Sequence, residues 1–542
     1  MISSAAEVSQ SPQVRGVDSN PANRQVFLIL LALLPPLVLG LLVLPPAIAL
    51  AVAFPSWLLV PWVWRRPVRG LYLILGATLL FEIFPLNFSD SLTDRVQFFL
   101  NLSTSNSSLQ GVPVTPFELL LVSVILIWIT SSLAKRSPFE LPRGPIVGAY
   151  AIYAVVVVAA EVRGLASGGP YLTTLWELRP QAYALLAFVV TSSLVRTRGD
   201  LIRLAGLFFS VVAAKALIAD YRYLVTLHSD ISGVEALMAH EESYFFGLFL
   251  VGALALALWC RRRWILIPVI GLTPAVVLAL IVNQRRAGVI ALTAGIVVLL
   301  VLAIRFDLAK RRPLAIASVL CIIAIALLLG IFWNHQSGIL GQLVRPFHSF
   351  YEPDPRDFLS NAYRQAEDQN LLLTIRSSPI FGIGFGLPML YIYPMADISK
   401  QYPLWNIIPH NTLLWIGMRM GAIGLAAFFG LLAMAILQAS RQGTRRDVFL
   451  RSVAIFAIAA IGMELTVGYV DLQLDNYRNL IFLGILLGVI QRLPRIRGIG
   501  ARVEPMQPLM SVDQAGSTRR SAARRDRRTA AASGTSHAAS VR

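Results

Sequence analysis

Long runs of apolar residues recur along the chain from about Val26 to Ile490, and short polar stretches separate them. A hydrocarbon core about 30 Å thick requires roughly 20 apolar residues per transmembrane helix, and these runs have the matching length. Transmembrane barrels give short segments of alternating polarity instead, and the sequence shows no such segments. The pattern therefore predicts an all-α, polytopic integral membrane protein.

The runs predict about fourteen transmembrane helices. Prolines at 35, 36, 45 and 46 can break or kink the first two, so the expected number ranges from about 12 to about 14. The expected helices lie at about 26–44, 47–63, 71–88, 115–133, 145–162, 180–195, 200–218, 243–260, 264–283, 287–304, 313–333, 410–439, 448–469 and 478–491.

Five segments follow from this pattern. Residues 1–25 and the basic stretch 492–542 are expected to be disordered cytoplasmic tails. Residues 26–333 hold the first eleven helices, and residues 410–491 hold the last three. Between them, residues 334–409 form one long extramembrane loop. Loops of this length are usually functional.

The long loop is expected to contain short helices. Phe358, Leu359, Tyr363 and Ala366 keep helical spacing, which predicts one helix at about 356–376.

The distribution of basic residues gives the expected orientation. Cytoplasmic loops carry an excess of Lys and Arg, and alternate connections are basic throughout. These basic connections lie at 65–69, 135–143, 196–198, 261–263, 310–312, 441–446 and 492–497. The pattern predicts that both termini are cytoplasmic and that residues 334–409 face outward.

Composition adds two limits to this picture. The formal net charge is +18, but most of the excess belongs to the topology signal, so a nucleic-acid partner is not expected. The basic tail is expected to contact anionic lipid headgroups. Cys260 and Cys321 lie in or beside apolar runs and imply no disulfide framework, and the scattered His and Cys residues predict neither a metal nor a cofactor.

Three of the expected helices begin on the outer side directly after a cation or an imidazole. The marking residues are Arg179, the pair Arg285 and Arg286, and His410. A helix N-terminus offers unpaired amide N–H groups and roughly half a positive charge. The set therefore predicts a phosphate or diphosphate site at the outer membrane face.

The arginines differ in how strongly they indicate a ligand. Arg179 has an equal alternative as a headgroup anchor paired with Glu177. Arg285 and Arg286 break the charge rule that the inner loops obey, which favours an assigned anionic partner. Arg286 is preferred because Ala287 and Gly288 behind it leave space for a bulky ligand.

His410 follows Pro409 and opens an apolar run, so its simplest interpretation is a helix-start histidine that binds a loop carbonyl. Of the six histidines, only His240 and His410 lie at an expected outer helix start, which favours a catalytic role instead. An imidazole that titrates near neutrality can accept the proton of a hydroxyl group. His410 is therefore the candidate catalytic base.

The loop before His410 contains Gly382, Gly384 and Gly386 in SPIFGIGFG. It lacks the flanking strand and helix of a dinucleotide loop. The glycines are expected to allow tight turns that bring the loop over the helix ends. Arg376 and Asn411 are further candidate contacts from this loop.

Intramembrane acids support a second class of function. Glu82, Glu118 and Glu464 lie within apolar runs, where acids can mark a proton or ion path. The alternative is therefore a transporter or flippase.

Three stretches resemble the superfamily of bacterial O-antigen ligases and O-antigen polymerases. They are NQRRAGVIAL, RSSPIFGIGFG and PHNTLLWIGMRMGAIGL, and together they cover roughly residues 280–430. The resemblance implies a metal-independent membrane glycosyltransferase of polysaccharide biosynthesis in the bacterial cytoplasmic membrane. Its donor would be a polyprenyl-diphosphate-linked glycan used at the outer face, and its acceptor a glycan, a lipid or a protein.

Residue roles also follow from the resemblance. It assigns Arg286 to the essential arginine of the family, His410 to its loop-end histidine and Arg179 to a second phosphate-binding arginine. The stretch HEESYFFGLF departs from the family pattern, so His240, Glu241 and Glu242 receive no family role. Their charge can contact acceptor sugar or cap the helix, and capping is preferred. The sequence does not separate a polymerase from a ligase or a protein glycosylation enzyme.

Overall fold

A computed structural model describes residues 59–496 apart from 84–92, 94–96, 103–112, 136–140, 230–233, 235–236, 261–262, 308–309, 335–337, 401 and 472–475. The first expected helix, most of the second, the tail 1–25 and the tail beyond Ile496 lie outside the described residues. The described part of the chain is helical and contains no strand.

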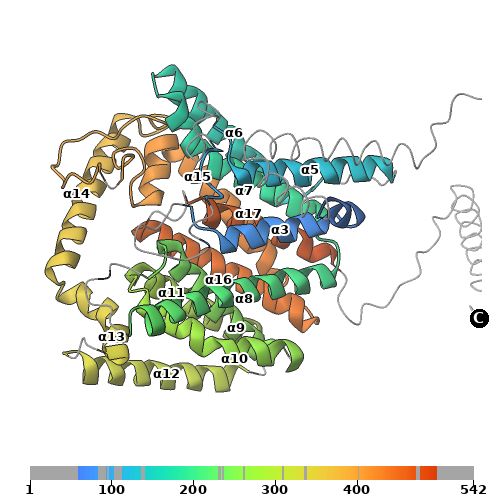
Figure 1. The fold of residues 1–542 in the computed structure, drawn as a ribbon, viewed down its shortest axis with the longest axis vertical. Helices are drawn as coiled ribbons and strands as arrows, with labels where there is room; N and C mark the ends of the chain where they lie inside the picture. The colour runs from blue at the N-terminus through green and yellow to red at the C-terminus, as the bar shows by residue number, and fades with distance from the viewer. Residues whose placement is uncertain are drawn as a thin grey trace, which may run out of the picture. The chain divides into compact units, whose positions relative to one another are not determined.

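The labelled α-helices follow the expected order (Figure 1). They are α3 (Val68–Leu80), α5 (Pro116–Ala134), α6 (Pro145–Ala166), α7 (Tyr171–Leu194), α8 (Arg198–Tyr221), α9 (His240–Trp259), α10 (Arg263–Val282), α11 (Arg286–Phe306), α12 (Arg311–Phe332), α13 (Gly338–Tyr351), α14 (Pro355–Ser377), α15 (Thr412–Ser440), α16 (Val448–Val470) and α17 (Tyr477–Arg492). Most of them run side by side, and α14 lies across them at one end (Figure 1).

The all-α, polytopic membrane architecture is confirmed. Among the described residues, nine helices are long and apolar enough to cross a membrane. The total of about fourteen stays a prediction, because the N-terminal helices lie outside the described residues. Many apolar side chains on the spanning helices are exposed, such as Val155 on α6 and Ile322 on α12, as expected for surfaces that meet hydrocarbon.

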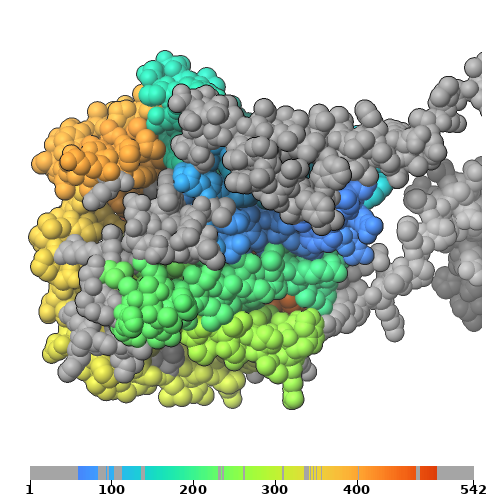
Figure 2. All heavy atoms as spheres, in the orientation of Figure 1, coloured from blue at the N-terminus to red at the C-terminus, as the bar shows by residue number. Residues whose placement is uncertain are grey.

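Small residues bring neighbouring helices close together. A Cβ added at Gly484 of α17 would lie 2.2 Å from the Ala184 carbonyl oxygen of α7. A Cβ at Gly295 of α11 would lie 2.5 Å from Met463 of α16. Close packing of this kind is the main source of attraction between helices in lipid. Figure 2 shows α3, in blue, against α8, in green, with no gap between their surfaces.

One expected boundary needs correction. The helix expected at 180–195 begins at Tyr171, with Pro180 inside it. A proline is typical of a first helical turn, but here α7 tolerates it in the interior. The loop 334–409, which was expected to contain short helices, contains α13 and α14, and α14 confirms the helix expected at 356–376.

Candidate functional site

A cavity of about 420 Å³ lies where α9, α11 and α15 begin and α16 ends. His240, Arg285, Arg286, His410 and Asp471 line it. The structure thus brings together the two helix starts, at 286 and 410, that the topology placed on one side of the membrane.

The first cavity is amphipathic. Its rim carries Arg345 and Arg364 besides the residues above, with Gln284, Asp357 and Ser360. Its other wall is apolar and comes from α9, α10 and α11, namely Leu250, Val277, Leu280, Ile281, Val289 and Leu292. A cationic rim therefore adjoins an apolar floor that belongs to membrane-spanning helices.

A second cavity, of about 380 Å³, adjoins the first. Arg286, Ala287, Arg364 and His410 line both cavities. These four residues therefore lie between the two spaces. A group bound in either cavity can reach the same imidazole and guanidinium groups.

His410 is held by a carboxylate that sequence reasoning did not identify. Its Nδ1 lies 3.1 Å from Oε2 of Glu367 on α14, and its backbone N–H donates to the same oxygen at 3.0 Å. Glu367 is buried, whereas the His410 side chain is 29% exposed. The ring of Tyr363 also packs against the imidazole in a T-shaped arrangement. The imidazole is thus fixed in orientation while part of it still faces the cavities.

Arg286 is held in place from α13 and α14. Its guanidinium donates to Ser349 Oγ at 3.3 Å and to Asn361 Oδ1 at 3.2 Å, and it lies 3.4 Å from an oxygen of Asp357. Its own helix begins at this residue, with Arg285 as the N-cap. The guanidinium group and the free amides of the first turn are therefore presented at the same place.

The space expected behind Arg286 is only partly available to a ligand. Ala287 lines both cavities, but a Cβ at Gly288 would lie 2.5 Å from Ser243 Cβ. Gly288 therefore serves contact between α11 and α9. The interpretation that Gly288 leaves room for a ligand is wrong.

Two further arginines of the long loop enter the first cavity. Arg345 donates to Gln284 at 2.8 Å and pairs with Asp354 at 2.9 Å. Arg364 lines both cavities and forms no ion pair with another described residue. The sequence places Arg364 within the helix expected at 356–376. It does not show which face of that helix meets the cavity, so Arg364 was not identified as a site residue.

Arg179 lies elsewhere. It lines neither of the two cavities, its side chain is buried, and its Nε lies 3.1 Å from Glu118 Oε1. It also donates to Asn101 Oδ1 at 2.8 Å and to the Pro113 carbonyl. Because α7 begins at Tyr171, Arg179 has no helix N-terminus beside it. The structure therefore does not bring Arg179 together with Arg286, and the pairing with Glu177 considered for it is replaced by one with Glu118.

The glycine loop packs against a break in α15. Gly421 has φ +62° and interrupts the helix. Ile383 N donates to the Met418 carbonyl and Gly384 N to the Arg419 carbonyl, at 2.8 and 3.1 Å. Gly382, Gly384 and Gly386 have φ of +68°, +91° and +77°, which only glycine adopts freely.

Arg419 ties this loop to the bundle. Its buried guanidinium donates to the carbonyls of Gly384, Leu387 and Ile407 and to the carboxylate of Glu177 on α7. Asn411 caps α15 by accepting from Leu414 N, and it lines the second cavity. Arg376 is exposed on the last turn of α14 and lines neither cavity.

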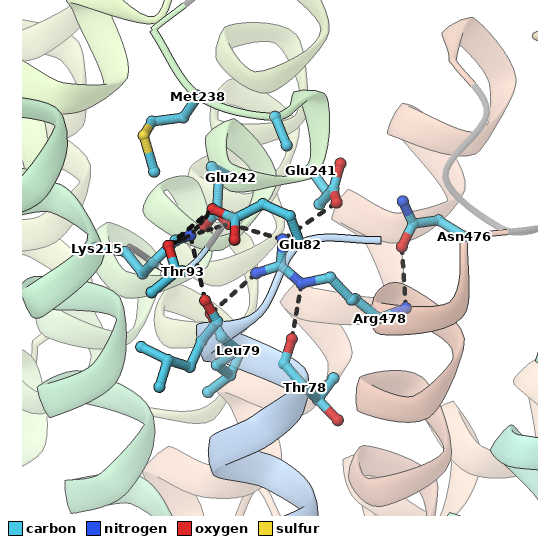
Figure 3. Close-up of polar contacts among 12 residues, drawn as sticks. Thr78, Leu79, Glu82, Thr93, Lys215, Met238, Glu241, Glu242, Asn476 and Arg478 are labelled. Atoms are coloured by element: carbon cyan, nitrogen blue, oxygen red, sulfur yellow. Dashed lines mark hydrogen bonds and ion pairs between the residues drawn. The ribbon is translucent and has the colours of Figure 1, made fainter. Parts of the chain in front are cut away.

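The start of α9 is fixed by a buried ion cluster (Figure 3). Arg478 of α17 lies 3.1 Å from Glu241 and 2.7 Å from Glu242, and Lys215 of α8 pairs with Glu242 and with Glu82. The α9 N-cap has no side-chain hydrogen bond. Glu241 and Glu242 lie in the first turn of α9, as expected for acids at a helix N-terminus, and their carboxylates also pair with the buried cations.

The cations of this cluster also donate hydrogen bonds to the carbonyl groups at the C-terminal end of α3. Arg478 donates to the carbonyls of Thr78 and Leu79 (Figure 3). Lys215 donates to the carbonyl of Leu80. These are end carbonyls that the helix itself leaves unpaired. The cluster joins α3, α8, α9 and α17, and it leaves His240 at the cavity with Nδ1 3.4 Å from Asp471.

The fold and the cavities define an integral membrane protein with a cation-rich site at one end of its helix bundle. Residues 272–429 match the family described as O-antigen ligase, which confirms the resemblance found in the sequence. The match spans Arg286, Glu367 and His410 but not His240. No curated protein matches the chain.

Proposed function

We propose that the protein is a glycosyltransferase that moves a glycan from a polyprenyl diphosphate to an acceptor hydroxyl group. The family match supports an O-antigen ligase-like or polymerase-like membrane function. The observation that carries the finer proposal is the first cavity, whose cationic rim adjoins an apolar floor. A lipid diphosphate has the same division into an anionic head and an apolar chain.

The arginines take the charge of the leaving group. Arg286 and Arg364 face the space between the two cavities, and Arg285 adds a third guanidinium at the start of α11. Guanidinium groups bind phosphate oxygens in paired hydrogen bonds. Cations placed before the reaction stabilise charge as it develops on a departing diphosphate. In this proposal they take the role that a metal ion has in other transferases.

His410 receives the proton of the acceptor. Glu367 beside Nδ1 holds the N–H tautomer at that nitrogen, which leaves Nε2 with a lone pair. A histidine oriented by a carboxylate is a common arrangement for a general base.

The proposed setting is the bacterial cytoplasmic membrane, with both termini in the cytoplasm and the site facing outward. The support is the basic connections on one side and the shared position of the starts of α11 and α15 at the other end. The acceptor is a glycan, a lipid or a protein, so the proposal includes ligase and polymerase activity. The surrounding partner is membrane lipid, and no nucleic acid is involved.

Proteoliposomes test the proposal against the flippase alternative. They contain the purified protein, a labelled polyprenyl-diphosphate glycan and the glycan acceptor. Formation of a new glycosidic bond, lost in Arg286→Ala and His410→Ala at equal protein level, supports the transferase. Translocation of the lipid without a new bond overturns it. Of the three acids that suggested an ion path, Glu82 and Glu118 are paired with Lys215 and Arg179, which favours the enzyme. Glu464 is buried and accepts a hydrogen bond from Asn479 at 3.4 Å.

A further inference from the structure

The second cavity is lined by one face of α14. Asn361, Gln365, Asp368, Gln369 and Leu372 recur at helical intervals, so their side chains leave the helix on the same side. Asn411 and Tyr469, from the start of α15 and the end of α16, line the same space. Its volume of about 380 Å³ falls within the range of roughly 300–1,000 Å³ of small-molecule sites.

The amide groups on this face are available to a ligand. Within the described part of the chain, the side chains of Gln365 and Gln369 form no hydrogen bond. Each amide both donates and accepts hydrogen bonds, as a sugar hydroxyl does. Asp368 adds a carboxylate, which accepts from hydroxyl groups.

Tyr469 gives this polar space an apolar side. Its side chain is 60% exposed although it lies at the end of a spanning helix. An aromatic ring offers a rigid apolar face together with a polar edge. Leu372 and Ile290 line the cavity beside it. Amides, a carboxylate and an aromatic face together match a pyranose ring, which has hydroxyls at its edge and C–H groups on its face.

The position of the second cavity indicates whether it binds the sugar of the donor or that of the acceptor. Apolar residues of α10, a membrane-spanning helix, line the first cavity but not the second. The second cavity borders His410 on the side of Glu367, Asp368 and Asn411. A hydroxyl bound there reaches the imidazole, while a diphosphate in the first cavity reaches the arginines.

We infer that the second cavity is the acceptor subsite and that its ligand is a carbohydrate bound by the α14 face and Tyr469. The inference rests on the proposed transferase function. The acceptor oxygen forms a bond to the anomeric carbon as the bond from that carbon to the diphosphate oxygen breaks. The hydroxyl proton moves to His410 Nε2, and the polyprenyl diphosphate departs with the bonding electron pair.

Steady-state kinetics of the purified protein test the inference. Lipid-linked glycan and unmodified acceptor glycan, both extracted from cells that lack this protein, serve as donor and acceptor. The variants are Gln365→Ala with Gln369→Ala, and separately Tyr469→Ala. Matched controls are Gln442→Ala and Tyr171→Ala, since Tyr171 is also 60% exposed and neither residue lines a cavity described above.

The expected result is an acceptor KM raised about 10-fold in each test variant, because two neutral hydrogen bonds or one aromatic contact are lost. The donor KM and kcat stay within about twofold, and the controls match the wild type. A raised donor KM with an unchanged acceptor KM overturns the inference and assigns the cavity to the donor glycan. Unchanged values for both substrates also overturn it. A wild-type protein without transferase activity is a different outcome, because it refutes the proposed function itself.

Discussion

Oε2 of Glu367 lies 3.1 Å from Nδ1 of His410 and accepts the His410 backbone N–H as well. A helix of the long loop thereby fixes both the backbone and the ring of a residue at the start of α15. We predict that Glu367→Gln lowers kcat by about 10²-fold, the lower range for a general base, because the imidazole loses its orientation. The acceptor KM changes little, and the pH–rate profile changes shape, as measured with the purified protein.

His348 and Glu352 provide the control for this pair. Glu352 lies 3.5 Å from His348 one turn away, but it is 72% exposed and lines neither cavity. Glu352→Gln should leave kcat within about twofold of the wild type. Full activity of Glu367→Gln across the pH range would show that Glu367 does not position the base.

Arg364 is expected to contribute to catalysis although helical periodicity alone did not select it. Arg364→Ala should lower kcat/KM for the donor by about 10²-fold, because a cation without another ion-pair partner is removed from the space between the cavities. Arg376→Ala on the same helix changes one exposed arginine outside both cavities and is the matched control. Equal activity of the two variants would remove Arg364 from the site.

The sequence predicts one part of this site well and another part poorly. Arg286 and His410 were found because each marks a helix start, and hydropathy fixes where spanning helices begin. Glu367 and Arg364 lie in mid-helix, where periodicity gives the helix but not the face that meets the bundle. Arg179 was misplaced because the residues after Tyr171 are too polar for a hydropathy pattern to include them in the helix.

Asp368 predicts a pH-dependent stability of the acceptor cavity. Burial raises the pKa of Asp368, and the charge of Glu367 raises it further. The folded protein therefore binds a proton that the unfolded chain has already released. The ionised carboxylate of Asp368 therefore destabilises the folded state at pH values above the raised pKa. This destabilisation disappears below the ordinary pKa of about 3.9. Asp368→Asn should raise the Tm in detergent at pH 7, and the difference should vanish near pH 4.

The pKa of Asp397 is shifted in the opposite direction and provides the control. It is exposed, and hydrogen bonds from Ser399 lower its pKa. Asp397→Asn should leave the Tm unchanged or slightly lower at pH 7. A Tm for Asp368→Asn that is equal to or below the wild-type value at pH 7 would contradict the assigned cost of the Asp368 charge.

The glycine loop allows backbone strain to be separated from crowding. Gly384 and Gly168 share a φ of +91°, but a Cβ at Gly384 would lie 2.4 Å from Gly164 N, whereas Gly168 has open space. Gly168→Ala should cost about 1 to 2 kcal/mol, from strain alone. Gly384→Ala should cost clearly more and lower activity, because the loop must also move away from Gly164 of α6. Equal Tm values for the two variants would show that the loop can move without cost.

The buried cluster at the start of α9 supports the most direct test of the fold. Lys215 pairs with Glu82 and Glu242 and is fully buried. Lys215→Met should destabilise the protein by about 3 to 5 kcal/mol, because two carboxylates lose a buried partner. Adding Glu82→Gln should recover part of the loss by removing one of those charges. The Tm in detergent measures both effects.

Arg203 supplies the comparison for Lys215. Its side chain is 53% exposed where it pairs with Asp200 at 3.1 Å, so Arg203→Met should cost less than about 1 kcal/mol. If Lys215→Met were no more costly than Arg203→Met, the cluster would not hold α9. The position of His240 beside Asp471 would then need another cause. A large loss that Glu82→Gln partly reverses would instead show that charge balance among α3, α8 and α9 fixes this edge of the first cavity.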